Sequence, residues 1–197
     1  YTPTSRLDAN LCISNNEVEP FNHWTSAHLY LGAGNVTCRV AVLENRQITP
    51  GSEGLVQFVL DKPVCAAFGD YFILRDSSAK KTIGGGKVID PLAEAKGRGR
   101  QQRVQQLRAM SSESTKIALE ALLKISSGGV DLTKFSRARN LAINESENLF
   151  KELRMKKIFH DLNQWGFSFQ NWNLVLEKLA DEVCVLQKET KEGLGIP

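Results

Sequence analysis

The segment of residues 68–91 constrains the fold of this chain more than any other, because it combines two apolar strands with a triple glycine. Its sequence is Phe-Gly-Asp-Tyr-Phe-Ile-Leu-Arg-Asp-Ser-Ser-Ala-Lys-Lys-Thr-Ile-Gly-Gly-Gly-Lys-Val-Ile-Asp-Pro. The apolar runs on either side of the polar turn predict strands over Tyr71–Arg75 and Thr82–Ile89. Glycines inside a strand usually mark a bulge or a close approach of two backbones. We therefore expect an ordered hairpin here, not a flexible linker.

Four further β-type segments precede this hairpin, and no helical pattern separates them. Turn signals such as Pro50-Gly51 divide one segment from the next. Six short strands at this spacing favour an all-β fold over residues 1–92, a small antiparallel barrel whose closure removes exposed sheet edges. The expected strands are Asn10–Ser14, Ala27–Leu31, Val36–Leu43, Leu55–Leu60, Tyr71–Arg75 and Thr82–Ile89.

The pattern becomes helical after Pro91. Residues 93–110 are expected to form a basic connector that runs into a helix. Residues 111–197 are expected to form a mainly α winged-helix module with a C-terminal helix, because three short helices followed by a small hairpin are typical of that fold. The expected elements are an apolar helix face over Ile117–Ile125, helices starting at Asp131 and Asn144, a hairpin of Ile158–His160 with Gly166–Ser168, and a helix from Asn171 to about Glu189 with Trp172, Val175, Leu176, Leu179 and Val183 on one face.

Positive charge is concentrated in one segment of the chain. Residues 75–108 hold 9 Lys or Arg and 3 Asp or Glu, whereas residues 109–197 hold 12 of each. A local basic segment favours a polyanionic partner, bound through phosphate contacts that carry little sequence information. For residues 98–108 a solvated connector is the alternative. The cations of the basic segment are Arg75, Lys80, Lys81, Lys87, Lys96, Arg98, Arg100, Arg103 and Arg108.

The sequence contains no pattern of a self-sufficient active site. It has neither a GxxxxGK[ST] nucleotide loop nor a GxSxG nucleophile motif, and its three histidines have no metal-ligand spacing. No apolar run approaches the ~18 residues of a membrane span. We therefore expect no catalytic, cofactor or metal site within the chain, no membrane partner, a cytoplasmic protein and a monomer. The four cysteines, which form no CxxC pair, are expected to be buried and reduced: Cys12, Cys38, Cys65 and Cys184.

Several motifs of the chain resemble one family. Leu74-Arg75-Asp76-Ser77, Thr82-Ile-Gly-Gly-Gly86 and Asp90-Pro91 resemble the end of domain three in bacterial selenocysteine-specific elongation factors. Val36-Thr37, Pro50-Gly51 and Leu60–Pro63 resemble earlier parts of the same barrel. Gly129-Val-Asp-Leu-Thr-Lys-Phe and Ala138-Arg139 resemble the first winged-helix module that follows the barrel in this family.

The resemblance implies a function. The family consists of translational GTPases, related to elongation factor Tu, that deliver selenocysteyl-tRNA to a recoded UGA codon on the ribosome, guided by an mRNA hairpin. The chain would be a middle fragment, the barrel contacting the T stem of the tRNA and the winged-helix module beginning the arm toward the mRNA. GTP and Mg²⁺ would bind to a GTPase domain of the parent protein that lies before this fragment, so the fragment itself would not be an enzyme.

The resemblance also implies which residues contact tRNA. Lys62, Arg75, Asp76, Ser77 and Thr37 fall at positions that match tRNA contacts of domain three in elongation factor Tu, and His28 falls at a further one. Lysine and arginine pair with phosphates, and hydroxyl groups hydrogen-bond phosphate oxygens or 2′-hydroxyls. The basic turn adds Lys80 and Lys81. The first loop, at Glu17-Val18, lacks the basic residues of that relative.

Two other functions remain open at this point. In one, the chain is a structural arm whose barrel contacts a neighbouring domain and whose connector is solvated. In the other, it is a DNA-binding winged-helix regulator with a β-barrel sensor. The balanced charge of the third helix of the module, with Glu145, Glu147 and Glu152 against Lys151 and Arg154, counts against the regulator.

Overall fold

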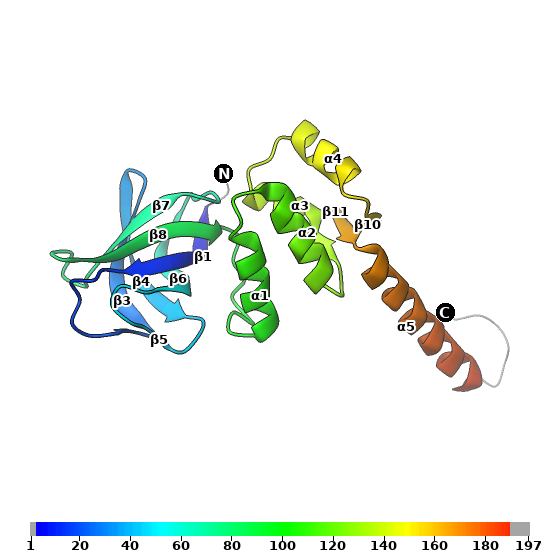
Figure 1. Cartoon of the computed structure of the whole chain (residues 1–197), viewed down its shortest axis with the longest axis horizontal. Helices are drawn as coiled ribbons and strands as arrows, with labels where there is room; N and C mark the ends of the chain where they lie inside the picture. Colours follow the sequence, from blue (N-terminus) through cyan, green and yellow to red (C-terminus); the bar gives the residue numbers. More distant parts are fainter. Residues whose placement is uncertain (1–2, 190–197) are drawn as a thin grey trace.

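A closed β-barrel forms one end of the molecule and a helical module forms the other (Figure 1). The computed structural model describes residues 3–189. Six antiparallel strands follow the order β1-β6-β4-β3-β7-β8, and β8 pairs back with β1. The predicted six-stranded barrel is therefore confirmed. Its strands are β1 (Thr4–Ile13), β3 (Thr25–Leu31), β4 (Gly34–Val42), β6 (Glu53–Val64), β7 (Tyr71–Arg75) and β8 (Thr82–Asp90); β2 (Phe21–Asn22) and β5 (Gln47–Ile48) form a separate two-stranded sheet.

The barrel interior is filled by residues that alternate along each strand. In β1 the side chains of Leu7, Ala9, Leu11 and Ile13 are all at most 1% exposed, as expected when every second residue points inward. Phe58 is fully buried and meets Phe72 edge to face, with ring centroids 5.0 Å apart. The expected strand at Asn10–Ser14 is the second half of β1, which starts six residues earlier.

The three glycines of β8 lie where neighbouring backbones come closest. A Cβ at Gly85 would lie 2.8 Å from the carbonyl oxygen of Phe72, and Cβ atoms at Gly84 and Gly86 would overlap carbonyl oxygens of β1. Gly84–Gly86 pair on one side with β7 and on the other with β1. The interpretation of the triple glycine as a close backbone approach is confirmed, because a side chain there would push the closing strand away from its neighbours.

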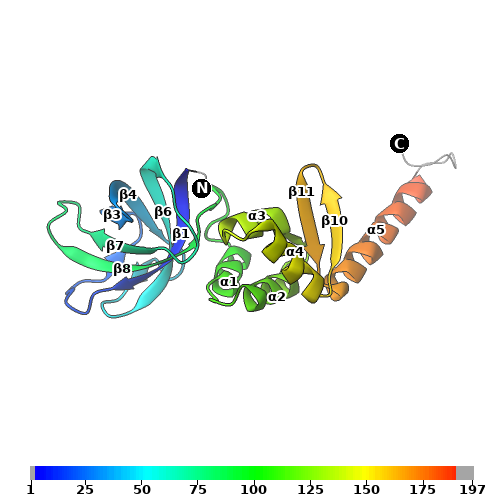
Figure 2. The same cartoon turned by 90° about the horizontal axis from the view of Figure 1, so that it is seen from above.

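In the part of the chain that the structure describes, five helices and a small sheet follow the barrel, and the last helix projects away from it (Figures 1 and 2). Helices α2, α3 and α4 precede the β10–β11 hairpin, and β9 pairs with β11. This succession is the predicted winged-helix arrangement. The elements are α1 (Gln101–Met110), α2 (Thr115–Ile125), β9 (Val130–Asp131), α3 (Leu132–Ala138), α4 (Ile143–Glu152), β10 (Lys156–His160), β11 (Asn163–Phe167) and α5 (Phe169–Glu189).

Two buried polar side chains satisfy the carbonyl groups that helix C-termini leave unpaired. Arg139, at the end of α3, donates to the carbonyl oxygens of Met110 and Ser112 at 2.6 and 2.8 Å, next to the end of α1. Asn171 of α5 donates to the carbonyl oxygen of Leu123 at 2.8 Å, near the end of α2. Each contact joins two helices by filling an acceptor that has no partner within its own helix.

The barrel and the helical module share a second apolar core. Ile89 of β8 and Leu55 of β6 point out of the barrel and pack in one buried cluster with Val104 and Leu107 of α1. Arg139 also stacks on Phe68 of the loop between β6 and β7, with its guanidinium carbon 3.7 Å from the ring centroid. The barrel therefore does not end in a free linker, since α1 covers part of its outer surface.

Several sequence-based expectations about burial are wrong. Of the four cysteines only Cys38 is buried, and its burial raises the pKa of the thiol to about 12; Cys12, Cys65 and Cys184 are exposed and free. Ile117 is 58% exposed because α2 buries Ala118, Leu119, Leu122 and Leu123 instead. On the expected apolar face of α5, Leu176 and Leu179 are 46% and 55% exposed, because α5 projects beyond the module.

Candidate nucleic-acid interface

Three of the expected contact residues form a row across adjacent strands of the barrel. His28 of β3 lies opposite Thr37 of β4 on one side and opposite Arg75 of β7 on the other. Their inward neighbours Ala27 and Leu74 are fully buried, so the row occupies the outer face of the sheet. In the sequence Thr37 follows His28 by 9 positions and Arg75 follows Thr37 by 38, and antiparallel pairing alone brings the three residues together.

The β7–β8 turn extends this row and is built around Asp76. The Asp76 carboxylate accepts hydrogen bonds from the backbone N–H groups of Lys80 and Lys81 at 2.8 and 2.9 Å and from the Ser78 hydroxyl. These bonds, that of Ser78 above all, lower the pKa of Asp76 to about 2. Asp76 is thus an organiser of the turn, and its oxygen atoms are occupied within the protein.

Two side chains of the row contact backbone carbonyl groups of the turn. The His28 ring nitrogen Nε2 lies 3.2 Å from the carbonyl oxygen of Ser77, and Arg75 donates to the carbonyl oxygen of Ala79 at 3.3 Å. Arg75 also stacks on Tyr30, with its guanidinium carbon 5.0 Å from the ring centroid. Tyr30 was missed by sequence reasoning, although its position two residues after His28 in a strand places it on the same face.

The three lysines of the candidate set differ in whether their ammonium groups are paired with a carboxylate. Lys81 forms an ion pair with Glu17, with Nζ 2.8 Å from Oε1. Lys62, near the end of β6, and Lys80, in the turn, are exposed, and within residues 3–189 neither ammonium group has a carboxylate partner. Lys62 and Lys80 are therefore better placed than Lys81 to bind an external anion. The pairing with Glu17 gives the acidic first loop a role in neutralising part of the turn.

The basic connector divides into buried and exposed cations. Arg103 of α1 donates to Asp8 of β1 and Asp90 of β8, at 2.5 and 2.6 Å, and both carboxylates are almost completely buried. Burial raises the pKa of Asp8, although Arg103 acts in the opposite direction. Arg108 pairs with Glu44 at 2.7 Å. Arg103 is thus a structural contact between barrel and helix, not a phosphate ligand.

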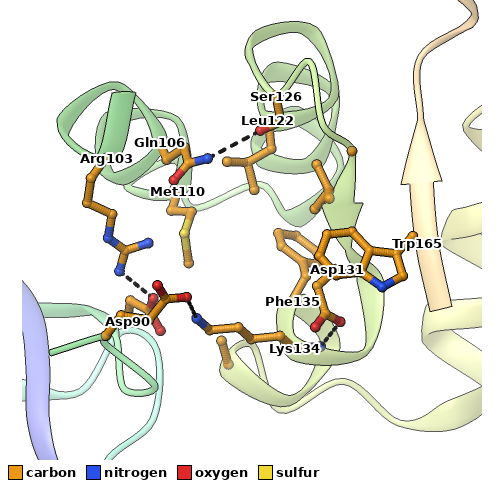
Figure 3. A pocket seen from close by; sticks show the side chains of 14 residues that line it. Asp90, Arg103, Gln106, Met110, Leu122, Ser126, Asp131, Lys134, Phe135 and Trp165 are labelled. Carbon is orange, nitrogen blue, oxygen red and sulfur yellow. Dashed lines mark hydrogen bonds and ion pairs between the residues drawn. The ribbon is translucent and has the colours of Figure 1, made fainter. Parts of the chain in front are cut away.

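A cavity of about 220 Å³ lies beside this cluster (Figure 3). Its charged lining side chains have partners within the protein: Asp90 accepts from Arg103, Lys134 contacts Glu94 at 2.7 Å, and Asp131 accepts from the backbone N–H of Lys134 at 2.8 Å. The side-chain amide of Gln106, which also lines the cavity, donates to the Ser126 hydroxyl at 3.4 Å. Because these polar groups already have partners, the cavity is part of the junction and offers little to hold a charged ligand.

Among the described residues, the triple glycine does not fit a phosphate site for GTP and Mg²⁺. A phosphate-binding loop needs free backbone N–H groups at a helix N-terminus, whereas Gly84–Gly86 lie inside a strand paired on both sides. Within the described part of the chain, no three His, Cys, Asp or Glu side chains are grouped to hold a metal ion. Among residues 3–189, no helix has both the length and the apolar character to cross a membrane.

The third helix of the winged-helix module presents mainly acidic groups. Glu145 accepts from the backbone N–H of Ala142 at 3.0 Å, and Glu152 pairs with Lys116 at 3.0 Å. Lys151 is the basic residue of its last turn. A helix that reads a DNA groove needs a positive face, so α4 does not favour the DNA-binding alternative.

Comparison with known proteins gives the same fold for the barrel. Residues 8–95 match the family model described as "Selenocysteine-specific elongation factor, beta-barrel domain". The barrel is similar to the barrel domain of selenocysteine-specific elongation factors. The matched range includes all eight candidate contact residues and the close-packed glycines of β8.

Three selenocysteine-specific elongation factors are similar to the chain over longer or shorter parts. That of Escherichia coli K12 is 31% identical over 123 residues, which is 62% of this chain and 18% of the relative. That of Desulfomicrobium baculatum is 24% identical over 154 residues, 78% of this chain and 24% of the relative. That of Haemophilus influenzae is 32% identical over 88 residues, 45% of this chain and 14% of the relative. The chain thus matches less than a quarter of each relative, and a match of 154 residues extends beyond the barrel.

Proposed function

We propose that this chain supplies the tRNA-contacting barrel, and the first module of the mRNA-directed arm, of a cytoplasmic selenocysteine-specific elongation factor. Its RNA partner is selenocysteyl-tRNA, gripped at the T stem, and its further partners are the ribosome and an mRNA hairpin reached through the rest of the protein. GTP and Mg²⁺ act in a GTPase domain outside this sequence. The similarity of the barrel to the barrel domain of that family supports the proposal, and the row of Thr37, His28 and Arg75 carries it.

The row has the chemistry that an A-form RNA backbone requires. Arg75 of the row and Lys80 of the adjoining turn supply positive charge to phosphates, and the hydroxyl groups of Thr37 and Ser77 can donate to phosphate oxygens or 2′-hydroxyls. Lys62, near the end of β6 and outside the row, adds a further unpaired charge. Asp76 contributes by holding the turn, and His28 by its contact with Ser77. Such a surface reads the shape of a duplex and leaves its base sequence unread.

The proposal is tested by the affinity of the chain for tRNA at low and moderate salt. Replacing Lys62 or Arg75 with alanine removes one phosphate contact, so each variant should bind more weakly and lower the steepness of the salt dependence by about one unit. Lys178→Ala, on the distant helix α5, removes the same charge and should leave both quantities unchanged. If the wild type and the three variants bound tRNA with equal affinity and equal salt dependence, the proposed interface would be rejected.

A purely structural arm is a second candidate, and the junction favours it. Arg103 and the shared core of Leu55 and Ile89 with α1 support a packing role for much of the connector, and Arg139 of the helical module adds a contact with the barrel loop. In that case the chain would transmit the position of the barrel to the helical module. The same tRNA measurement distinguishes the two, because a structural arm predicts no loss of affinity in either barrel variant.

A further inference from the structure

An exposed tryptophan, Trp24, lies at the start of β3 among cations that the candidate row does not include. Its ring is 39% exposed and stacks with His23, at a centroid distance of 5.8 Å. The guanidinium carbon of Arg98, from the connector, lies 4.9 Å from the Trp24 ring centroid. Segments 74 residues apart in the sequence thus meet at one aromatic side chain.

The backbone holds Trp24 in an unfavourable conformation. Its φ is +71°, in the left-handed region that bulky residues rarely adopt, and its N–H donates to the carbonyl oxygen of Val40 at 2.7 Å. Strained residues that are kept exposed are often found at binding sites, because the surrounding structure must stabilise them for a reason other than packing. The strain here presents an aromatic side chain outward at the edge of the barrel.

Arg98 contacts the ring, and three further arginines lie on segments next to it in the fold; we call these residues the Trp24 patch: Trp24, Arg39, Arg46, Arg98 and Arg100. Arg39 lies opposite Ser26 on the outer face of β4, and the carbonyl oxygen of Arg46 accepts from the N–H of His23 at 2.8 Å. Arg100 closes a tight turn with Gly97, one residue before α1 and next to Arg98.

The charges of the Trp24 patch are not neutralised within the protein. Among residues 3–189, no carboxylate forms an ion pair with any of its four guanidinium groups. The neighbouring acid, Glu44, is already paired with Arg108. An aromatic face beside uncompensated cations is the arrangement with which proteins bind single-stranded nucleic acid, since bases stack on the ring and phosphates meet the cations.

The Trp24 patch continues the candidate row. Arg39 and Thr37 are two residues apart on the outer face of β4, which places them about 7 Å from each other, and Ser26 and His28 are related in the same way on β3. An RNA held at the row can therefore reach the patch along the same two strands. The connector cations Arg98 and Arg100 then act next to the barrel surface.

We propose that Trp24 is a stacking platform for an unpaired nucleobase of the RNA bound to the barrel, with Arg98 and the other arginines of the patch contacting its flanking phosphates. This inference rests on the proposed function for the identity of the RNA as tRNA, but the patch itself requires only an RNA with an unstacked base. It extends the contact from a duplex backbone at the row to a single-stranded segment beside it.

The test uses the full chain and two probes, a short oligouridylate and an abasic strand of the same length, each followed by fluorescence anisotropy at low salt. The wild type should prefer the oligouridylate, and Trp24→Ala should lose about tenfold in affinity for it while binding the abasic strand as before. Trp24→Phe keeps an aromatic face and should retain most of the preference. Arg98→Ala should weaken the binding of both strands, whereas Lys178→Ala should weaken neither.

Three results would overturn the platform. The first is an equal affinity of the wild type for the oligouridylate and the abasic strand. The second is a loss of affinity in Trp24→Ala that is equal for the two strands. The third is stronger competition by an acidic peptide than by oligouridylate, which would identify a protein partner. Far-ultraviolet circular dichroism of each variant ensures that a loss of affinity does not come from unfolding. Arg75→Ala should weaken tRNA binding yet preserve the preference for bases, so the row and the platform can fail independently.

Discussion

His28 and Arg75 lie directly opposite each other where β3 pairs with β7, and both side chains contact the β7–β8 turn. The conformation of this turn depends on Asp76, whose carboxylate accepts hydrogen bonds from two backbone N–H groups. The geometry of the candidate interface is therefore set by contacts within the barrel, because strand register fixes its row and local hydrogen bonds fix its turn.

Asp76 should stabilise the turn only while it is ionised. Its pKa is lowered to about 2 from an ordinary value of 3.8, so its contribution is complete above about pH 4 and is lost as the pH falls through about 2. Asp76→Ala should expose the amide protons of Lys80 and Lys81 to faster hydrogen exchange at neutral pH, whereas Asp76→Asn, which keeps one acceptor oxygen, should have a smaller effect. Unchanged exchange in Asp76→Ala would show that the turn does not depend on this carboxylate.

Arg103 should be essential for the junction between barrel and helical module. Arg103→Ala leaves Asp8 and Asp90 buried without their cation, which should reduce the free energy of unfolding by about 3–5 kcal/mol in urea titrations. Arg108→Ala is the matched control, since its pair with Glu44 is exposed and should be worth at most about 1 kcal/mol.

The deficit of Arg103→Ala should also depend on pH. Burial raises the pKa of Asp8, and loss of Arg103 should raise it further, so protonation stabilises the folded variant at low pH. The deficit should therefore be largest near pH 7 and shrink as the pH falls toward 5. A deficit that is the same at both pH values would show that the charge of Asp8 is not what Arg103 compensates.

The glycines of β8 should tolerate no side chain. Gly86→Ala places a Cβ against the carbonyl oxygen of Asn10 and the ring of Phe72, so we expect a loss of about 2 kcal/mol or more in the free energy of unfolding. Gly99→Ala is the control, because a Cβ there meets no atom within 4 Å. Equal stability of the two variants in thermal or urea unfolding would contradict the role assigned to the close approach.

The local features of the fold could be predicted from the sequence because they depend on residues close together in the chain. The alternation of apolar and polar residues in segments such as Val36–Leu43 predicted the strands, and the triple glycine predicted the close approach of neighbouring backbones. The role of Arg103 could not be predicted, because its partner Asp8 is 95 residues away and becomes buried only when α1 packs on the barrel. For the same reason the sequence alone indicates a single basic segment and does not separate its buried cations from its exposed ones.

The candidate interface was predictable in part. The resemblance supplied His28, Thr37 and Arg75, and their alignment in one row follows from the register of β3 with its two neighbours. The pairing of Lys81 with Glu17 depends on a long-range contact between the first loop and the β7–β8 turn, which no sequence pattern indicates. Trp24 gave no signal in the sequence, since neither its positive φ nor its contact with Arg98 is visible there.

The central claim, that the outer face of β3, β4 and β7 binds the tRNA backbone, is tested most directly by titrating the isotopically labelled chain with tRNA and following its amide resonances. We predict that the largest shift changes cluster at His28, Thr37, Arg75 and the turn of residues 76–81, and that they vanish as salt is raised. Changes confined to α4 and the β10–β11 hairpin, with the barrel row unperturbed, would contradict the claim.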